Sequence, residues 1–170
     1  MKLIEKYLPN YQFTETHSII INSSQENCYK EMFQLDLSQS WIIRNLFKLR
    51  GLPSSAQELS RFADGMNFTL LEENKFFEFI YGFKVKNSIE RINNKKSFIE
   101  NDLGYSYKAV WNFEFDKILK DKTKITTTTN VKCITPKSNR IFSVYWFFIE
   151  PFSALIRKQM LKMLKNKLEN

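Results

Sequence analysis

The sequence predicts an α+β fold in which a curved antiparallel sheet wraps around a long, kinked C-terminal helix. Two observations favour a sheet in the middle and helices around it. Between residues 67 and 133, apolar and polar residues alternate with a period of two, as in strands with one buried face. Residues 23–66 and 136–170 follow the helical period instead, and Pro151 interrupts the last helical segment.

Composition limits the classes to which the protein can belong. A chain of 170 residues is long enough for one domain with its own core, so we expect residues 1–170 to form a single domain. A hydrophobic fraction of 43% argues against disorder. Cys28 and Cys133 lie too far apart for a disulfide framework or a metal motif. Reduced thiols and a cytoplasmic location are the simplest interpretation.

The charge is strongly basic, with a formal net value of +8. Most basic residues are lysines spread along the whole chain, whereas readers of bases and phosphates favour arginine, whose planar fork makes paired hydrogen bonds. We therefore expect a solvated lysine surface and no nucleic-acid partner. Peripheral contact with a membrane stays open.

The N-terminal third is predicted to contain one strand and three helices. Residues 11–21 alternate as a strand. Ser23 and Glu26 have the spacing of a capping box at the start of the next helix. A second helix begins after Ser40 and ends at Gly51, with Ile42, Leu46 and Leu49 on one face, and a third covers about residues 56–63. We expect residues 40–66 to act as a movable cover, hinged at residues 51–55.

Four further segments are predicted as consecutive strands: residues 68–73, 75–85, 105–116 and 122–134, with a weaker one at residues 95–102. Short polar turns between them indicate an antiparallel meander with one face in water. The inward positions include Phe79, Tyr81, Tyr107, Ala109, Trp111, Phe113, Thr127 and Thr129. The outward positions include Glu78, Lys84, Lys108, Asn112 and Glu114.

The segment from Ser143 to Lys158, SVYWFFIEPFSALIRK, is the most apolar part of the chain. It is shorter than the roughly 20 residues that span a bilayer, and Glu150 and Pro151 interrupt it, so we expect no transmembrane segment. Before Pro151 the apolar residues surround the helix, which indicates burial on more than one side. A kink at Pro151 would let the helix follow a curved sheet.

The stretches FTETHSIII, LDLSQSWIIRNLFKLRGLP, YGFKV, AVWNFEFD and YWFFIEPFSALIRKQML occur in this order along the chain. Together they resemble the helix-grip fold of the START-domain and birch-pollen-allergen-like superfamily (SRPBCC), in particular an uncharacterised bacterial branch of polyketide-cyclase-like proteins. The resemblance implies a hydrophobic cavity between sheet and last helix, in proteins that bind lipids, sterols, polyketides or quinones. It also implies an acidic and a basic residue in the strand before the last helix, where this chain has TTTNV.

Candidates for chemistry are few. The single histidine, His17, is the only catalytic candidate, and no partner of a triad is indicated. Glu15 shares its face, although we expect no direct contact between the two side chains. No phosphate loop, metal cluster or cofactor motif occurs. Buried hydroxyls at Thr127 and Thr129 would require water, a ligand or each other as partners.

The sequence thus favours a non-catalytic protein that binds an apolar small molecule, such as a lipid, a fatty acid or a polyketide-like compound. We expect the cavity to lie between the inward aromatic residues and the helix around the kink. The predicted ligand-binding residues are Phe79, Tyr81, Tyr107, Ala109, Trp111, Phe113, Thr127, Thr129, Phe148 and Phe152. Two alternatives stay open: an aromatase/cyclase-like enzyme that uses His17 with a tyrosine such as Tyr107, and a protein-interaction module with a filled core.

Overall fold

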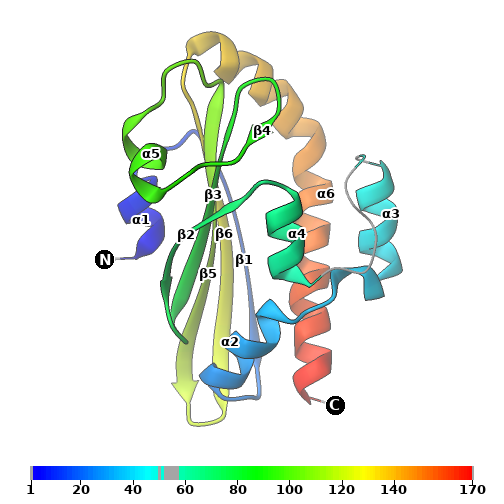
Figure 1. Ribbon diagram of the computed structural model, residues 1–170. Helices are drawn as coiled ribbons and strands as arrows, with labels where there is room; N and C mark the ends of the chain where they lie inside the picture. Colours follow the sequence, from blue (N-terminus) through cyan, green and yellow to red (C-terminus); the bar gives the residue numbers. More distant parts are fainter. Residues whose placement is uncertain (1, 50, 52–57, 170) are drawn as a thin grey trace.

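The computed structural model describes residues 2–49, 51 and 58–169. These residues form a six-stranded antiparallel sheet in the order β1-β6-β5-β3-β2, and β4 pairs with the end of β3 (Figure 1). The strands are β1 (Phe13–Ile21), β2 (Thr69–Asn74), β3 (Glu78–Val85), β4 (Ile89–Glu90), β5 (Tyr107–Leu119) and β6 (Lys122–Cys133).

The helices cover both faces of this sheet (Figure 1). One face carries the long C-terminal helix together with the helical block that follows β1, and the other carries two short helices. The helical elements are α1 (Leu3–Tyr7), α2 (Gln25–Phe33), the 3-10 turn η1 (Leu37–Gln39), α3 (Trp41–Leu49), α4 (Leu59–Gly65), α5 (Lys95–Glu100) and α6 (Pro136–Glu169). The predicted α+β helix-grip architecture, a curved antiparallel sheet with a long C-terminal helix, is confirmed.

Strand pairing brings the start of the chain next to its last third. β1 pairs with β6 along its whole length, with Glu15 opposite Thr129 and His17 opposite Thr127. The β5–β6 hairpin places Trp111 opposite the same Thr129. Side chains on one face of three adjacent strands therefore converge beneath α6.

The helix starts follow from local capping. Ser24 accepts a hydrogen bond from the backbone N–H of Asn27 at the start of α2, so the cap lies one residue after the predicted Ser23. Ser40 caps α3 as predicted, through the N–H of Ile43. Ile43 and Phe47 form the buried face of α3, whereas the predicted stripe of Ile42, Leu46 and Leu49 is only partly covered or exposed.

α6 is one continuous helix of 34 residues, and Pro151 lies inside it. Figure 1 shows its first turns (gold) leaning over the end of the sheet before the helix runs down across it. Its C-terminal half buries Met160, Leu161 and Leu164. The predicted burial on several sides before Pro151 is wrong: Phe142 is buried there, but Phe147 and Phe148 are exposed. The sheet contacts only one side of the helix, so the side chains on its other side stay exposed.

The second face of the sheet is not in water, which corrects the predicted one-sided meander. The polar side chains of Glu78, Lys84, Lys108, Asn112 and Glu114 are buried there. α1 and α5 cover them with a separate apolar cluster made up of Leu3, Ile4, Tyr7, Leu8, Leu71, Ile80, Ile92, Phe98 and Val110. Residues 95–100, which were predicted as part of a weak strand, form α5 instead, because Asn94 caps a helix by accepting from the N–H of Ser97.

Two lysines hold α5 against this face. Lys84 donates to the carbonyl oxygens of Ser97 and Asn101 and to Asp102, 3.0 Å from its Nζ. Lys108 lies 2.9 Å from the other oxygen of Asp102. Burial lowers the pKa of Lys84. Burial raises the pKa of Asp102, but the hydrogen bonds from Lys108 and Lys84 outweigh that effect and hold it below its ordinary value.

Candidate functional site

A pocket of about 290 Å³ lies between the sheet, α6 and the helices α3 and α4. Its walls are mainly apolar and aromatic. They come from η1, α3, α4, the α4–β2 connection, four strands and α6: Leu37, Phe47, Phe62, Met66, Phe68, Phe83, Ile89, Tyr107, Ala109, Trp111, Thr129, Val131, Phe142, Tyr145, Trp146, Ile149, Ser153, Ile156, Arg157 and Met160. The volume is close to the lower end of the range for small-molecule pockets, about 300 Å³.

Two pairs of stacked aromatic rings belong to the pocket wall. Phe47 of α3 stacks on Phe62 of α4 with the ring centroids 4.8 Å apart. Phe68 stacks on Phe83 of β3 at 4.3 Å. Stacked pairs of this kind contribute about 0.5–1.5 kcal/mol beyond the area that they bury, so they stabilise this part of the wall.

One polar cluster interrupts the apolar walls, and Arg157 of α6 is its centre. The guanidinium donates to the hydroxyl of Thr129 at 2.6 Å and to the hydroxyl of Ser153, one helical turn earlier. Its Cζ lies 5.9 Å from the centre of the Trp111 ring. All four residues line the pocket, so a ligand there meets hydrogen-bonding groups at this point of the wall.

Glu15 of β1 balances the buried charge from behind the pocket wall. One carboxylate oxygen lies 2.7 Å from Nη1 of Arg157, and the side chain of Glu15 is only 4% exposed. The other oxygen lies 2.7 Å from Nε2 of His17. An uncompensated charge at such a position would cost several kcal/mol, on the order of 3–5, which the ion pair avoids.

The contact between Glu15 and His17 corrects the expectation that they do not touch. Side chains two residues apart on a strand point to the same face, with their Cα atoms about 7 Å apart. A carboxylate and an imidazole are long enough to bridge that separation. The geometry therefore links His17 to Arg157 through a shared carboxylate.

The two inward threonines do not use one another as partners. Thr127 accepts from the indole N–H of Trp111 at 2.9 Å, and Thr129 accepts from Arg157. Thr127 thereby fixes the orientation of the indole that lines the pocket, but it does not line the pocket itself.

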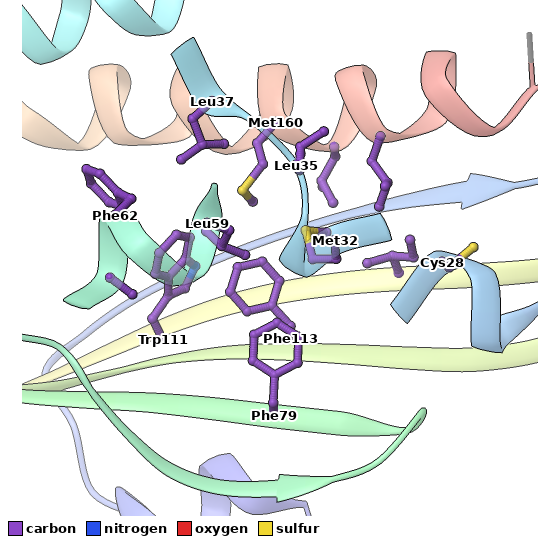
Figure 2. Close-up of a cluster of buried hydrophobic side chains, with 14 of the residues drawn as sticks. Cys28, Met32, Leu35, Leu37, Leu59, Phe62, Phe79, Trp111, Phe113 and Met160 are labelled. Atoms are coloured by element: carbon purple, nitrogen blue, oxygen red, sulfur yellow. The ribbon is translucent and has the colours of Figure 1, made fainter. Parts of the chain in front are cut away.

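The predicted ligand-binding residues fall into distinct groups. Tyr107, Ala109, Trp111 and Thr129 line the pocket. Figure 2 shows Phe79 and Phe113 pointing from the sheet into a cluster of packed side chains that includes Met32 and Met160. Phe79 and Phe113 are fully buried in this solid core and lie outside the pocket lining.

The remaining predicted residues also lie outside the lining. Tyr81 lines a second, more polar hollow beside Arg91 and Asp64. Phe148 and Phe152 are exposed on the outer side of α6, next to the pocket-lining Tyr145 and Ile149. Four of the ten predicted ligand-binding residues thus line this pocket, and the other six lie outside its lining.

Arg157 was not among the residues predicted for the site. The chain does carry a signal for it: Arg157 lies three, four and seven residues before Met160, Leu161 and Leu164, so a cation occupies the buried face of an amphipathic helix. The acidic and basic pair that the resemblance implied for the strand before the last helix is absent from β6. Here Glu15 and Arg157 supply such a pair from the two neighbouring elements.

The expected cover is present only in part among the described residues. α3 and α4 contribute Phe47, Phe62 and Met66 to the pocket wall. Gly51 follows α3 with a φ of +65°, a left-handed conformation that glycine adopts without strain. Most of the expected hinge, residues 52–55, lies outside the described residues, so the movement of the cover stays a prediction.

Two kinds of feature are absent from the described residues. Over residues 2–49, 51 and 58–169, no group of three or more histidine, cysteine, aspartate or glutamate side chains could hold a metal ion. In the same part of the chain, no helix combines the length and the apolar character needed to cross a membrane.

No family model matches the sequence, and no curated protein does. Solved structures match at low identity. Protein CV1439 from Chromobacterium violaceum is 14% identical, with 96% of this chain and 99% of that chain covered and a TM-score of 0.45. A protein from Bacillus thuringiensis is 14% identical, with 93% and 100% covered and a TM-score of 0.41.

An aromatase/cyclase from a Streptomyces species is also similar to this chain. It is 8% identical, with 92% of this chain and 93% of that chain covered and a TM-score of 0.36. At such identities and scores these likenesses carry no argument about activity or ligand.

Proposed function

We propose that the protein binds an amphipathic small molecule in this pocket, with a fatty-acyl or polyketide-like body against the aromatic walls. The polar group of the ligand accepts hydrogen bonds from Arg157. The observation that carries the proposal is the single polar cluster of Arg157, Thr129 and Ser153 in an otherwise apolar lining. Mostly apolar pockets with a few convergent polar groups are typical of small-molecule sites.

The position of His17 favours binding over catalysis. A general acid or base has to reach the proton that it transfers, within about 3 Å or through one water molecule. His17 contacts Glu15 and does not line the pocket. Tyr107 does line the pocket, four residues before Trp111 in β5, but its proposed catalytic partner His17 does not. His17 is therefore connected to the pocket only indirectly, through Glu15 and Arg157.

The direct test is native mass spectrometry of the purified protein, followed by organic extraction of any bound compound. In parallel, a fluorescent fatty acid and an uncharged hydrocarbon fluorophore of similar size are titrated into ligand-free protein. We expect one equivalent of either probe to bind, with the fatty acid bound more tightly. Absence of both a co-purified compound and probe binding would refute the proposal and favour an interaction module.

A variant of His17 separates binding from catalysis. His17→Gln keeps a hydrogen-bonding side chain beside Glu15 but cannot serve as an acid or base near neutral pH. A binding protein should retain the fatty-acid probe with a change of less than about threefold, since the residue lies outside the lining. Loss of a turnover reaction in a variant with unchanged melting temperature would establish the enzyme alternative instead.

A further inference from the structure

The first half of α6 exposes a continuous apolar surface. In Figure 1 this gold and orange part of the helix forms the upper outer edge of the molecule. Phe147 is 74% exposed and Phe148 is 65% exposed, so neither contributes to the core. The exposed apolar surface, here called the α6 face, consists of Ile141, Val144, Tyr145, Phe147, Phe148, Phe152 and Leu155.

The α6 face is a single stripe rather than scattered residues. Ile141, Tyr145, Phe148, Phe152 and Leu155 follow one another at steps of four, three, four and three, which places them on one side of a helix. From Ile141 to Leu155 the stripe is about 21 Å long at the helical rise of about 1.5 Å per residue. Contiguous exposed apolar surface of this kind marks a site of interaction.

Basic side chains border the stripe at both ends. Lys137 and Arg140 precede it, and Lys158 and Lys162 follow it; all four are exposed. Among the described residues, no ion pair includes any of the four. Glu150 is the only acidic residue between positions 137 and 162. The border is therefore cationic, in a chain whose formal net charge is +8.

We propose that the α6 face docks onto an anionic lipid surface. Aromatic and aliphatic side chains enter the interfacial layer, while Lys137, Arg140, Lys158 and Lys162 contact anionic headgroups. A helix with an apolar stripe, aromatic residues and a basic border is suited to lie in the plane of such an interface. Each lysine or arginine near an anionic surface contributes about a fivefold gain in affinity.

Charge argues against a second copy of the chain as the occupant. If two stripes pair antiparallel about a two-fold axis, Lys137 and Arg140 of one copy face Lys158 and Lys162 of the other. Like charges then oppose each other at both ends, and each copy carries only Glu150 to offset them. An anionic bilayer complements the same border without this repulsion.

The α6 face is continuous with the rim of the pocket. Tyr145 belongs to the face and also lines the pocket, and Ile149, the next residue after Phe148, lines it as well. When the protein is docked on the lipid surface, this rim of the pocket faces the lipid, so a ligand could enter the pocket from there. Such loading of the pocket rests on the proposed function, whereas docking itself does not.

The test is co-sedimentation of the full chain with vesicles of phosphatidylcholine alone and of phosphatidylcholine containing about one phosphatidylglycerol in three lipids. We expect binding to the anionic vesicles only, weakened by salt. Phe148→Ser should reduce that binding at least tenfold. The matched control is Phe77→Ser, because Phe77 is 63% exposed but lies just before β3, outside the α6 face.

Charge is tested with a second pair of variants. Lys137→Gln combined with Arg140→Gln should weaken binding to the anionic vesicles by about 25-fold, from two contributions of about fivefold each. The control combines Lys117→Gln with Lys120→Gln, which removes the same charge at the exposed end of the β5–β6 hairpin. If both double variants lose the same affinity for the anionic vesicles, the binding depends only on net charge. That result would overturn the proposal that the α6 face docks on the lipid surface.

Two other outcomes would also overturn the proposal. One is a dimer in lipid-free sedimentation that Phe148→Ser converts into a monomer, which would assign the face to self-association. The other is a monomer that binds neither vesicle type. In both cases the fluorescent fatty acid is titrated into the Phe148→Ser variant without vesicles. Retained probe binding there leaves the proposed function standing, since Phe148 does not line the pocket.

Discussion

Arg157 in α6 and Glu15 in β1 form an ion pair at 2.7 Å, although 142 residues separate them in the sequence. The pair joins the first strand of the sheet to the helix that the sheet grips. Thr129 and Ser153 accept hydrogen bonds from the same guanidinium, so the side chains of three residues are held by Arg157. Arg157 therefore contributes both to the stability of the fold and to the proposed recognition of a ligand.

Replacing Arg157 with Met should destabilise the fold by about 3 kcal/mol, because the carboxylate of Glu15 stays buried without its main partner. Urea unfolding followed by circular dichroism measures this. The double variant Glu15→Gln with Arg157→Met should recover at least half of the loss, since the buried charge is removed together with its partner. Arg91→Met is the control, because its pair with Asp64 is exposed and should contribute less than about 1 kcal/mol. Additive losses in the double variant would contradict a coupled pair.

Thr129→Val should weaken binding of the fatty-acid probe about threefold to tenfold and leave the hydrocarbon probe unaffected. The substitution keeps the shape of the side chain but removes the hydroxyl that holds the guanidinium of Arg157 in position. Fluorescence titration with both probes measures it. Thr126→Val, three positions earlier in β6 and on the opposite face, is the matched control and should change neither affinity. A parallel loss for both probes would mean that Thr129 shapes the wall rather than the polar cluster.

Ala109→Phe should abolish probe binding with little loss of stability. Ala109 is fully buried and lines the pocket, so an added ring extends into the empty volume beside Val131 and Phe142. In a filled core the same ring would overpack it and cost about 1–3 kcal/mol. Thermal unfolding and probe titration together distinguish the cases. A strong destabilisation, combined with undetectable probe binding to the unmodified chain, would favour the interaction module.

Lys84→Met should detach α5 from the sheet and lower stability by about 2 kcal/mol, because the C-terminal carbonyls of α5 lose their buried donor and Asp102 loses a partner. Hydrogen exchange should accelerate most in residues 95–102. Lys86→Met removes an exposed lysine two positions later in the sequence and should have an effect within about 0.5 kcal/mol. Unchanged exchange in α5 would show that the apolar cluster alone holds it.

Alkaline pH should weaken the fold through Cys133. Burial raises the pKa of its thiol from 9.0 to about 11, so the folded state keeps the neutral form that the unfolded chain loses first. The stabilisation is complete below about pH 9 and disappears as pH rises from 9 towards 11. Urea midpoints measured across this range should fall more steeply for the natural chain than for Cys133→Ala. Parallel curves would place the alkaline loss in other groups.

The sequence by itself determined the order and type of most elements. Strict alternation in β5 and β6 and the amphipathic pattern after Pro151 are local properties, and local properties survive any change in tertiary arrangement. The same alternation placed Tyr107, Ala109, Trp111 and Thr129 on one face of the sheet, and these four line the pocket. Backbone geometry fixes the period of a helix or strand and the face to which each side chain points, so both can be predicted from the order of the residues.

Only the tertiary structure decided which of these positions enclose space and which fill it. Phe79 and Phe113 have the same parity as Trp111 but are covered by α2 and the end of α6, so they became core. Phe148 and Phe152 face away from the sheet, because a helix offers just one side to the surface that grips it. The partnership of Glu15 with Arg157 depends on β1 pairing with β6 beneath α6. Such long-range contacts follow from packing between distant segments, for which no local pattern exists.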